Sequence, residues 1–290
     1  FCVLARLAAP YTDRQVFICG PGPFMDASRD ALRTCNVPDA QVHLEVFKSL
    51  DSDPFAAVKI EDAPESAELY TRLGQRTNTW LSAQTPAGQL FETDLRLRPN
   101  GDAGLMVVSL EAFRQYQLEN AWVWEHQALT RARFCAGDRE IGAKFEAIRC
   151  EVLRQPRELA KLRDEVLAMR QRMADAHPNK TELFDLKHDR GGLIDVEFIV
   201  QYLVLGYAHQ HASLTGNLGN IALLGMAGEL GLIPADQAAA VADSYREYRR
   251  LQHGLRLNNQ ASRAPREQVA EMAQGVRKLW NGVFGDSLEE

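Results

Sequence analysis

The spacing of apolar residues predicts a helical C-terminal region. Beyond residue 110 apolar positions recur every three or four residues, as in a stripe formed by Leu159, Leu162, Val166, Met169 and Met173. Further helices are expected over residues 194–205, which are apolar nearly all round, and over residues 219–230, 235–257 and 266–284. We therefore expect a helical domain over residues 112–290.

A helix and two strands are expected just before this domain. Residues 68–81 have helical spacing and are followed by turn residues at 84–88. Residues 90–97 alternate as in a strand, and a turn at Pro99-Asn100-Gly101 predicts a partner strand over residues 105–109. We assign this segment, residues 65–111, to a separate domain.

The N-terminal pattern predicts a Rossmann-like β-α-β fragment over residues 1–58. Its expected elements are a strand at 15–19, a helix at 24–34 and a strand at 41–47. Cys19, Gly20, Pro21 and Gly22 form the turn after the first strand, where a dinucleotide could lie, although G-x-G-x-x-G is absent. Residues 49–66 lose all periodicity, so we place a junction at 59–64.

Composition narrows the functional classes. A hydrophobic fraction of 46% with 25% charged residues is typical of a folded soluble protein, and a net charge of −6 favours neither nucleic acid nor an anionic membrane as partner. No apolar stretch reaches the roughly 20 residues that cross a bilayer. The five cysteines contain no C-x-x-C pair, which favours a cytoplasmic protein. Because the chain begins with Phe1 and not Met, we expect a truncated start.

The expected strand at 90–97 carries one charged face. Asp94, Arg96 and Arg98 share it, with about 7 Å between successive members. A carboxylate oxygen suits Mg²⁺, and guanidinium groups suit the phosphates that accompany it. The alternative is a solvated face on which opposite charges pair with little energetic effect.

A charged loop with two glycines precedes the most apolar helix. It carries Lys187, His188 and Arg190, and the helix start carries Asp195 and Glu197. Free N–H groups at a helix start can bind an anion. Alternatively, the two carboxylates complement the helix dipole. His188 has no second ligand at helical spacing, so a zinc site is not expected.

A third polar cluster is expected on a single helix. Its members are Trp122, Trp124, Glu125, Gln127, Arg131 and Arg133. Aromatic residues on a helix usually pack in the core, so we expect the tryptophans there and not on a stacking platform. The arginines partly share the face of Trp124.

Three motifs, covered by residues 94–101, 124–133 and 191–198, resemble one enzyme family. They are Asp-Leu-Arg-Leu-Arg-Pro-Asn-Gly, Trp-Glu-His-Gln-Ala-Leu-Thr-Arg-Ala-Arg and Gly-Gly-Leu-Ile-Asp-Val-Glu-Phe. From about residue 63 to 284 the chain resembles the adenylylating half of bifunctional glutamine synthetase adenylyltransferase/adenylyl-removing enzymes. The resemblance implies AMP transfer from ATP to a tyrosine of glutamine synthetase with Mg²⁺. It also implies an α+β, mostly α fold, in which a partial nucleotidyltransferase-type sheet precedes the helical bundle.

The resemblance assigns roles to the candidate residues. Asp94 matches the third metal-binding carboxylate of the family, and Arg96 and Arg98 contact phosphate or orient that carboxylate. Nucleotide-binding positions in the helical domain are Lys187, Arg190, Asp195 and Glu197. The first two metal-binding carboxylates belong to a Gly-Ser-x-x-Asp-x-Asp-like segment that this chain does not contain. We therefore expect no AMP transfer by this chain alone.

Residues 16–25 and 43–50 resemble a different protein, the end of the NAD-binding domain of a ferredoxin-NADP-reductase-type oxygenase reductase. The rest of that enzyme is missing, so neither NAD nor FAD is expected to bind, and two unrelated fragments joined by a gene artefact near residues 56–64 explain the chain most simply. Two alternatives remain open. One is a non-catalytic helical module that docks glutamine synthetase or a PII-type protein, and the other is an NAD(P)H-dependent reductase fragment.

Overall fold

The structure of this protein is a computed structural model. It describes residues 16–20, 29, 30, 33, 39, 42–46, 63–86, 88–89, 91–93, 99, 106–135 and 137–285. The chain divides into two compact units, Phe1–Ala63 and Pro64–Glu290. Each unit is described by itself.

The first unit contains a pair of parallel strands. β1 (Val16–Gly20) pairs with β2 (Val42–Val46), and Val16 lies opposite Val42. Both predicted strands are therefore confirmed. Parallel neighbours require a crossover connection, in keeping with the expected β-α-β unit. Cys19 and Gly20 end β1, whereas Pro21 and Gly22 lie outside the described residues.

The second unit begins with α3 (Ala63–Leu81) and a small hairpin of β3 (Gln84–Thr85) and β4 (Gly88–Gln89). The predicted strand over residues 90–97 is wrong at residues 91–93, which are not in a strand. The Phe91 N–H donates to the Leu81 carbonyl oxygen at 2.9 Å, and the Thr93 hydroxyl donates to Asn78 Oδ1 at 2.6 Å. These groups bind the end of α3, so they are not available to a neighbouring strand. Residues 94–98, with Asp94, Arg96 and Arg98, lie outside the described residues.

The predicted partner strand at 105–109 is also wrong over residues 106–109. Ser109 caps the next helix instead, because its hydroxyl accepts a hydrogen bond from the Ala112 N–H at 3.2 Å. That helix is α4 (Leu110–Glu119).

Helices make up the rest of the second unit, as predicted. They are α5 (Val123–Leu129), α6 (Arg139–Leu153), α7 (Leu159–Ala176), α8 (Leu193–Tyr207), α9 (Asn220–Glu229), α10 (Ala235–Leu257) and α11 (Arg266–Phe284). A 3-10 turn, η3 (Ala212–Thr215), and a short antiparallel pair, β5 (Phe184–Asp185) with β6 (Arg263–Ala264), complete it. The described part is thus mostly helical with small two-stranded sheets, which agrees with a mostly α member of the α+β class.

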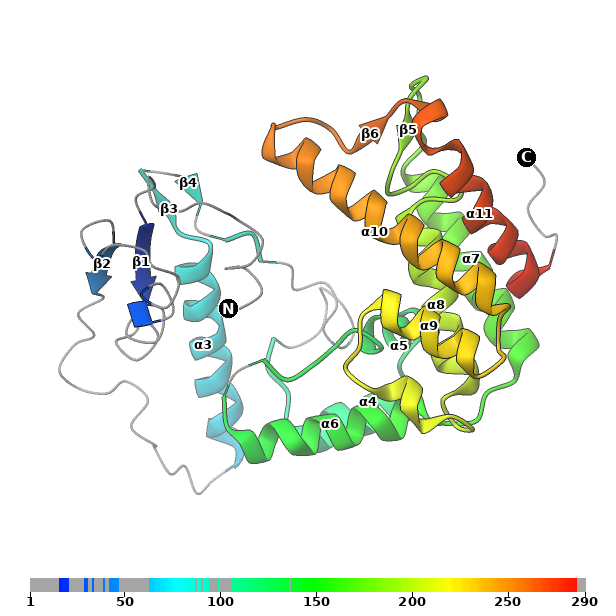
Figure 1. Cartoon of the computed structure of the whole chain (residues 1–290). Coiled ribbons are helices and arrows are strands. Elements are labelled where there is room, and N and C mark those ends of the chain that lie inside the picture. Colours follow the sequence, from blue (N-terminus) through cyan, green and yellow to red (C-terminus); the bar gives the residue numbers. More distant parts are fainter. Residues whose placement is uncertain are drawn as a thin grey trace. The chain divides into compact units, whose positions relative to one another are not determined.

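Helix α8 forms the centre of the core. It packs against α7, α9, α10 and α11 (Figure 1). Val196, Ile199 and Leu205 are fully buried on it. Burial of each such side chain contributes about 1.5–3 kcal/mol, and contact with partners on several sides explains why this helix is apolar nearly all round.

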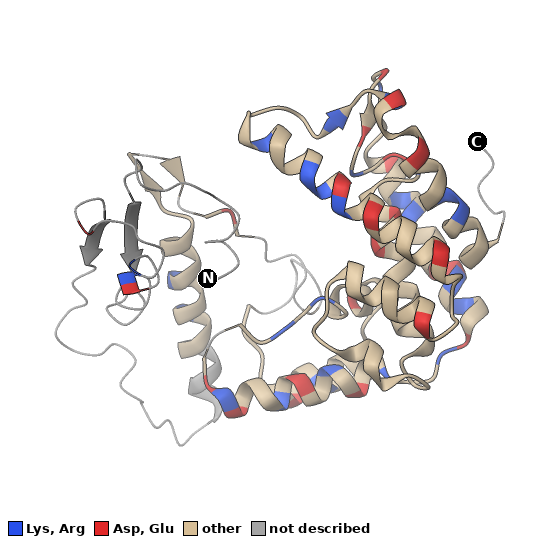
Figure 2. Ribbon diagram, in the orientation of Figure 1, with Lys and Arg blue, Asp and Glu red and all other residues tan. Residues whose placement is uncertain are grey.

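The outer helices carry charges of both signs. Along α6 and α10 blue and red positions follow one another (Figure 2). They include neighbouring pairs such as Glu140–Lys144 and Glu247–Arg250, separated by 2.7 and 2.6 Å. Exposed pairs of this kind stabilise a helix only slightly. No helix among the described residues is long and apolar enough to span a membrane.

Candidate functional site

The expected single helix from Trp122 to Arg133 is wrong, because α5 ends at Leu129. The buried guanidinium of Arg149, on α6, donates to the carbonyl oxygens of Leu129 and Thr130, each at 3.3 Å, and to that of Thr215 at 2.9 Å. These carbonyls therefore have partners without a further helical turn. Arg131 and Arg133 lie on the irregular segment that follows.

Arg131 and Arg133 line a cavity of about 460 Å³ at the start of α9. Gly219, the residue before α9, lines the same cavity and has no side chain to cap the helix. The Arg131 guanidinium donates to Asn220 Oδ1 at 3.2 Å. The arginine is thus fixed beside the first turn of α9, where backbone N–H groups add positive potential.

A hydrogen bond joins α5 and α8, the helices that carry two of the sequence motifs. Gln127 Nε2 donates to Gln201 Oε1 at 2.9 Å, which joins α5 to α8. The Tyr245 hydroxyl, from α10, donates to Glu197 Oε1 at 2.9 Å. Burial raises the pKa of Tyr245, and the neighbouring charge of Glu197 raises it further. The two motifs therefore lie on helices that contact each other, although Gln201 and Tyr245 themselves are outside the motifs.

Segment 94–101 also reaches Arg131, through Pro99 near its C-terminal end. Pro99 lines a second cavity, of about 360 Å³, together with Glu125 and Arg131. Glu125 is buried and accepts hydrogen bonds from the Tyr116 hydroxyl at 2.9 and 3.0 Å and from the Trp122 N–H at 2.9 Å. Arg131 thus lines both cavities, between the end of segment 94–101 and the start of α9.

The loop before α8 is organised around a buried ion pair. Arg170 Nε lies 2.5 Å from Asp195 Oδ1, and both side chains are at most 2% exposed. Asp195 Oδ2 accepts from the Gly191 N–H at 2.6 Å, while Arg170 Nη2 donates to the His188 carbonyl oxygen at 2.8 Å. The pair therefore connects α7, the loop and the first turn of α8.

The loop's backbone N–H groups are used internally. Those of residues 191–194 donate, in order, to Asp195 Oδ2 and to the carbonyl oxygens of Asp189, Leu186 and Lys187. Gly191 has φ +88°, and a Cβ there would lie 2.5 Å from the Ala273 carbonyl oxygen. A glycine is therefore required by the close approach of α11. These contacts favour the structural interpretation of the loop over backbone binding of an anion.

The other predicted loop residues lie nearer the surface. Lys187 is exposed, and Arg190 Nη2 donates to Gln171 Oε1 at 3.0 Å. Burial lowers the pKa of Arg190, and the nearby charge of Arg170 contributes. Nucleotide binding by Lys187, Arg190, Asp195 and Glu197 stays a prediction. No group of three or more potential metal ligands occurs among the described residues.

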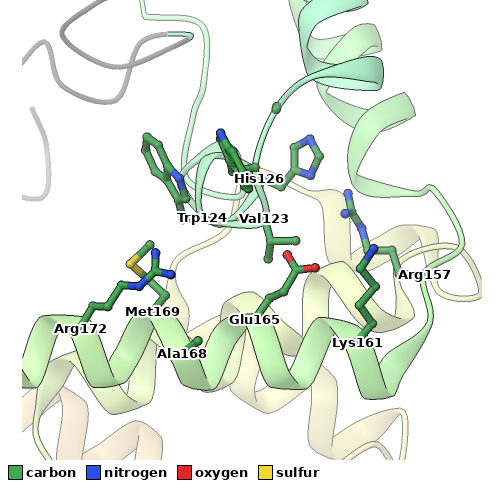
Figure 3. A pocket seen from close by; sticks show the side chains of 11 residues that line it. Val123, Trp124, His126, Arg157, Lys161, Glu165, Ala168, Met169 and Arg172 are labelled. Atoms are coloured by element: carbon green, nitrogen blue, oxygen red, sulfur yellow. The ribbon is translucent and has the colours of Figure 1, made fainter.

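A third feature, the groove between α5 and α7, was not predicted from sequence. It has a volume of about 550 Å³ and is lined by Trp122, Trp124 and His126 on one side and by Lys161 and Arg172 on the other (Figure 3). Trp122 is 67% exposed. The expectation that it packs in the core is wrong, because Trp122 precedes the first residue of α5 and so falls outside the packed helix.

Comparison with known proteins agrees with these motifs. Residues 51–148 match the sequence profile of a family described as glutamate-ammonia ligase adenylyltransferase. Residues 160–280 match that of a family described as GlnD PII-uridylyltransferase. The chain is therefore similar to nucleotidyltransferases over both segments.

Named relatives agree with the first profile. The bifunctional glutamine synthetase adenylyltransferase/adenylyl-removing enzyme of Aromatoleum aromaticum is 67% identical over 227 residues, which is 78% of this chain and 24% of that enzyme. The enzymes of the same name from Nitrosomonas europaea and Bordetella bronchiseptica are 56% and 57% identical, also over 78% of this chain. The chain spans about a quarter of the length of these relatives. The resemblance to this family is confirmed over 78% of this chain.

Proposed function

We propose that this chain is part of an enzyme that transfers AMP from ATP to a tyrosine of glutamine synthetase and so regulates nitrogen metabolism. The observation that carries the proposal is the position of Arg131, a residue of one family motif, which lines one cavity with Pro99 of a second motif and another cavity with Gly219. In this reaction the tyrosine oxygen bonds to the α-phosphorus and pyrophosphate leaves. Positive charge beside the phosphates stabilises the transferring group.

Residues 94–98 supply the remaining proposed roles. Asp94 is the proposed ligand for Mg²⁺ bound with ATP, and Arg96 and Arg98 are proposed to contact phosphate or orient Asp94. A two-metal site needs several carboxylates, of which the motif provides one. We therefore propose that the chain transfers no AMP by itself.

The loop residues fall into two groups. Lys187 is exposed and Arg190 is half-buried, and we propose these two side chains as nucleotide contacts. Asp195 accepts from Arg170 and Gly191, and Glu197 accepts from Tyr245. We assign the two carboxylates to positioning of the loop and of α8, since these hydrogen bonds occupy them.

An exchange of segments tests the proposal. Residues 64–285 of this chain replace the matching part of the Aromatoleum aromaticum relative, and glutamine synthetase is incubated with ATP labelled at the α-phosphate. We expect the exchanged enzyme to label glutamine synthetase and its Asp94→Asn variant to lose the activity. The unmodified 290-residue chain is expected to give no label. Labelling by the unmodified chain, or full activity of Asp94→Asn, contradicts the proposal.

A docking module is the second candidate function. Among the described residues, the buried apolar core of the second unit lies between Leu129 and Phe284, so the helices α5 to α11 supply a core of their own. Partners of such a module are glutamine synthetase or a PII-type protein. Capture of either purified protein by the full chain without nucleotide supports docking, and its absence with both argues against it.

We also propose that residues 1–58 are a foreign fragment that binds neither NAD nor FAD, and that the protein is cytoplasmic. Support comes from the division of the chain at Ala63 and from the relatives, which match 78% of it. Sequencing of genomic DNA across codons 40–90 tests the junction. A continuous reading frame there contradicts an artefact, and flavin absorbance in the purified protein contradicts the absence of a cofactor.

A further inference from the structure

The groove between α5 and α7 has an excess of positive charge. Among its described lining residues, Arg157, Lys161 and Arg172 face a single carboxylate, that of Glu165. Figure 3 shows Lys161, Glu165 and Arg172 rising from α7 toward the α5 side. Burial lowers the pKa of Arg157, which Glu165 partly offsets, so its guanidinium has lost part of its water. Partly desolvated cations of this kind form their strongest hydrogen bonds with phosphate or carboxylate oxygens.

Two indole rings lie at the same groove. Trp122 and Trp124 both line it, and Trp124 lies across from Arg172 and Met169 (Figure 3). With 67% of its surface accessible, Trp122 offers an aromatic surface to solvent. Exposed indole surface beside cations suits a ligand that has a planar ring as well as negative charge.

A buried histidine lies beside the groove. His126 is 6% exposed, and its Nε2 lies 2.8 Å from the Gln117 carbonyl oxygen, to which it must donate. Burial lowers the pKa of His126, with a contribution from Arg157, so the ring is neutral and Nδ1 keeps its lone pair. Nδ1 has no hydrogen-bond partner among the described residues, and neither has Arg157 Nε. Both atoms are shielded from solvent, so they lie beneath the groove surface and are not contacts for a ligand.

We propose that this groove binds a nucleoside phosphate. The phosphates pair with Lys161, Arg172 and Arg157, and the base stacks on an indole. The volume of about 550 Å³ falls within the usual range of small-molecule sites, about 300–1,000 Å³. This site is distinct from the cavities at Arg131 and does not depend on the proposed function.

Isothermal titration of the full 290-residue chain with ATP in EDTA tests the proposal. Lys161→Gln and Arg172→Gln remove single groove cations, and Arg163→Gln is the matched control, since Arg163 lies on the same helix outside the groove lining. Circular dichroism checks that each variant is folded. Tripolyphosphate and adenosine, titrated separately, supply the charge and the ring alone.

We expect ATP to bind more tightly than tripolyphosphate or adenosine. Either groove variant should weaken ATP binding about tenfold, whereas Arg163→Gln should change it less than threefold. Trp122→Ala should weaken the binding of ATP but not that of tripolyphosphate, which has no ring to stack. The proposal is overturned if millimolar ATP does not bind, or if Lys161→Gln, Arg172→Gln and Arg163→Gln all change ATP binding equally. It is also overturned if Asp94→Asn abolishes ATP binding, since that result would place ATP at residues 94–98. Failure of AMP transfer by the exchanged enzyme leaves these outcomes unchanged.

Discussion

Replacement of Asp195 by Asn should destabilise the second unit strongly. The substitution keeps the size of the side chain but leaves the guanidinium of Arg170, 1% exposed, without its counter-charge. Gly191 N–H and Arg170 Nε both bind this carboxylate, at 2.6 and 2.5 Å. Breaking a buried ion pair from one side costs about 3–5 kcal/mol, chiefly because the remaining charge stays desolvated.

Urea unfolding followed by circular dichroism measures this cost. With an m-value of about 3 kcal/mol/M, the midpoint should fall by about 1 to 1.7 M. Asp164→Asn on α7 is the matched control. Its ion pair with Arg163 is exposed, with side chains 44% and 70% accessible, so the free energy of unfolding should change by less than about 0.5 kcal/mol.

The double variant Arg170→Met/Asp195→Leu separates charge from packing. Since it removes both charges, it should be more stable than Asp195→Asn, although it loses the hydrogen bonds to His188 and Gly191. The reasoning is refuted if Asp195→Asn costs no more than Asp164→Asn, or if the double variant is the least stable of the set.

Three further perturbations test neighbouring parts of the structure. Gly191→Ala should lower the free energy of unfolding by about 2–4 kcal/mol, because φ is +88° and the new Cβ meets the Ala273 carbonyl oxygen. Gly231→Ala, at φ +70° with no atom within 4 Å of the new Cβ, should lower it by only about 1 kcal/mol. Equal melting temperatures of the two variants would contradict this difference. Tyr248→Phe removes the 3.0 Å hydrogen bond to the Gly191 carbonyl oxygen and should lower the free energy of unfolding by about 1–2 kcal/mol in urea, and no change would speak against that bond. Burial lowers the pKa of His126 in the folded protein, so as the pH falls below about 6.5 the imidazole is protonated in the unfolded chain before it is protonated in the folded one. The contribution of His126 to stability is therefore complete above that pH and is lost as the pH falls toward the lowered pKa of the folded state. His126→Gln should therefore flatten the fall of the urea midpoint between pH 8 and pH 5, and parallel curves for the two proteins would exclude this cause.

Much of the helical unit could be predicted from sequence because its signals are local. Residues 235–257 and 266–284 follow Pro234 and Pro265, and the observed helices α10 and α11 have the predicted bounds. Helix α8 was found from its continuous apolar run, which is long enough for a helix and lies at the centre of the core. Proline before a helix and burial on all sides both leave a trace in the adjacent sequence.

Structure that depends on distant partners could not be predicted. The end of α5 depends on Arg149, about twenty residues further along the chain, which binds the carbonyl oxygens of Leu129 and Thr130. Residues 91–93 bind the last turn of α3 and do not continue a strand, although their alternation favours one. Local periodicity carries no information on such tertiary hydrogen bonds.

The candidate site was predicted in its motifs but not in its arrangement. Arg170 follows Leu162 and Val166 at the spacing of the apolar stripe, but a charged residue in the sequence favours a solvated position. Its burial depends on the ion pair with Asp195, which lies 25 residues further along the chain. The part played by Arg131 depends on Asn220 and Pro99, which are far from it in sequence. The groove at Trp122 likewise depends on the distance between α5 and α7.

The most direct test of a shared site at Arg131 is the rate of AMP transfer by the exchanged enzyme carrying Arg131→Met. Arg139→Met, at the exposed first residue of α6, is the matched control, and thermal melting confirms that both variants are folded. If Arg131 lies beside the phosphates of the bound nucleotide, the rate should fall at least about tenfold in Arg131→Met and less than twofold in Arg139→Met. Equal rates in the two folded variants would contradict a phosphate site at Arg131.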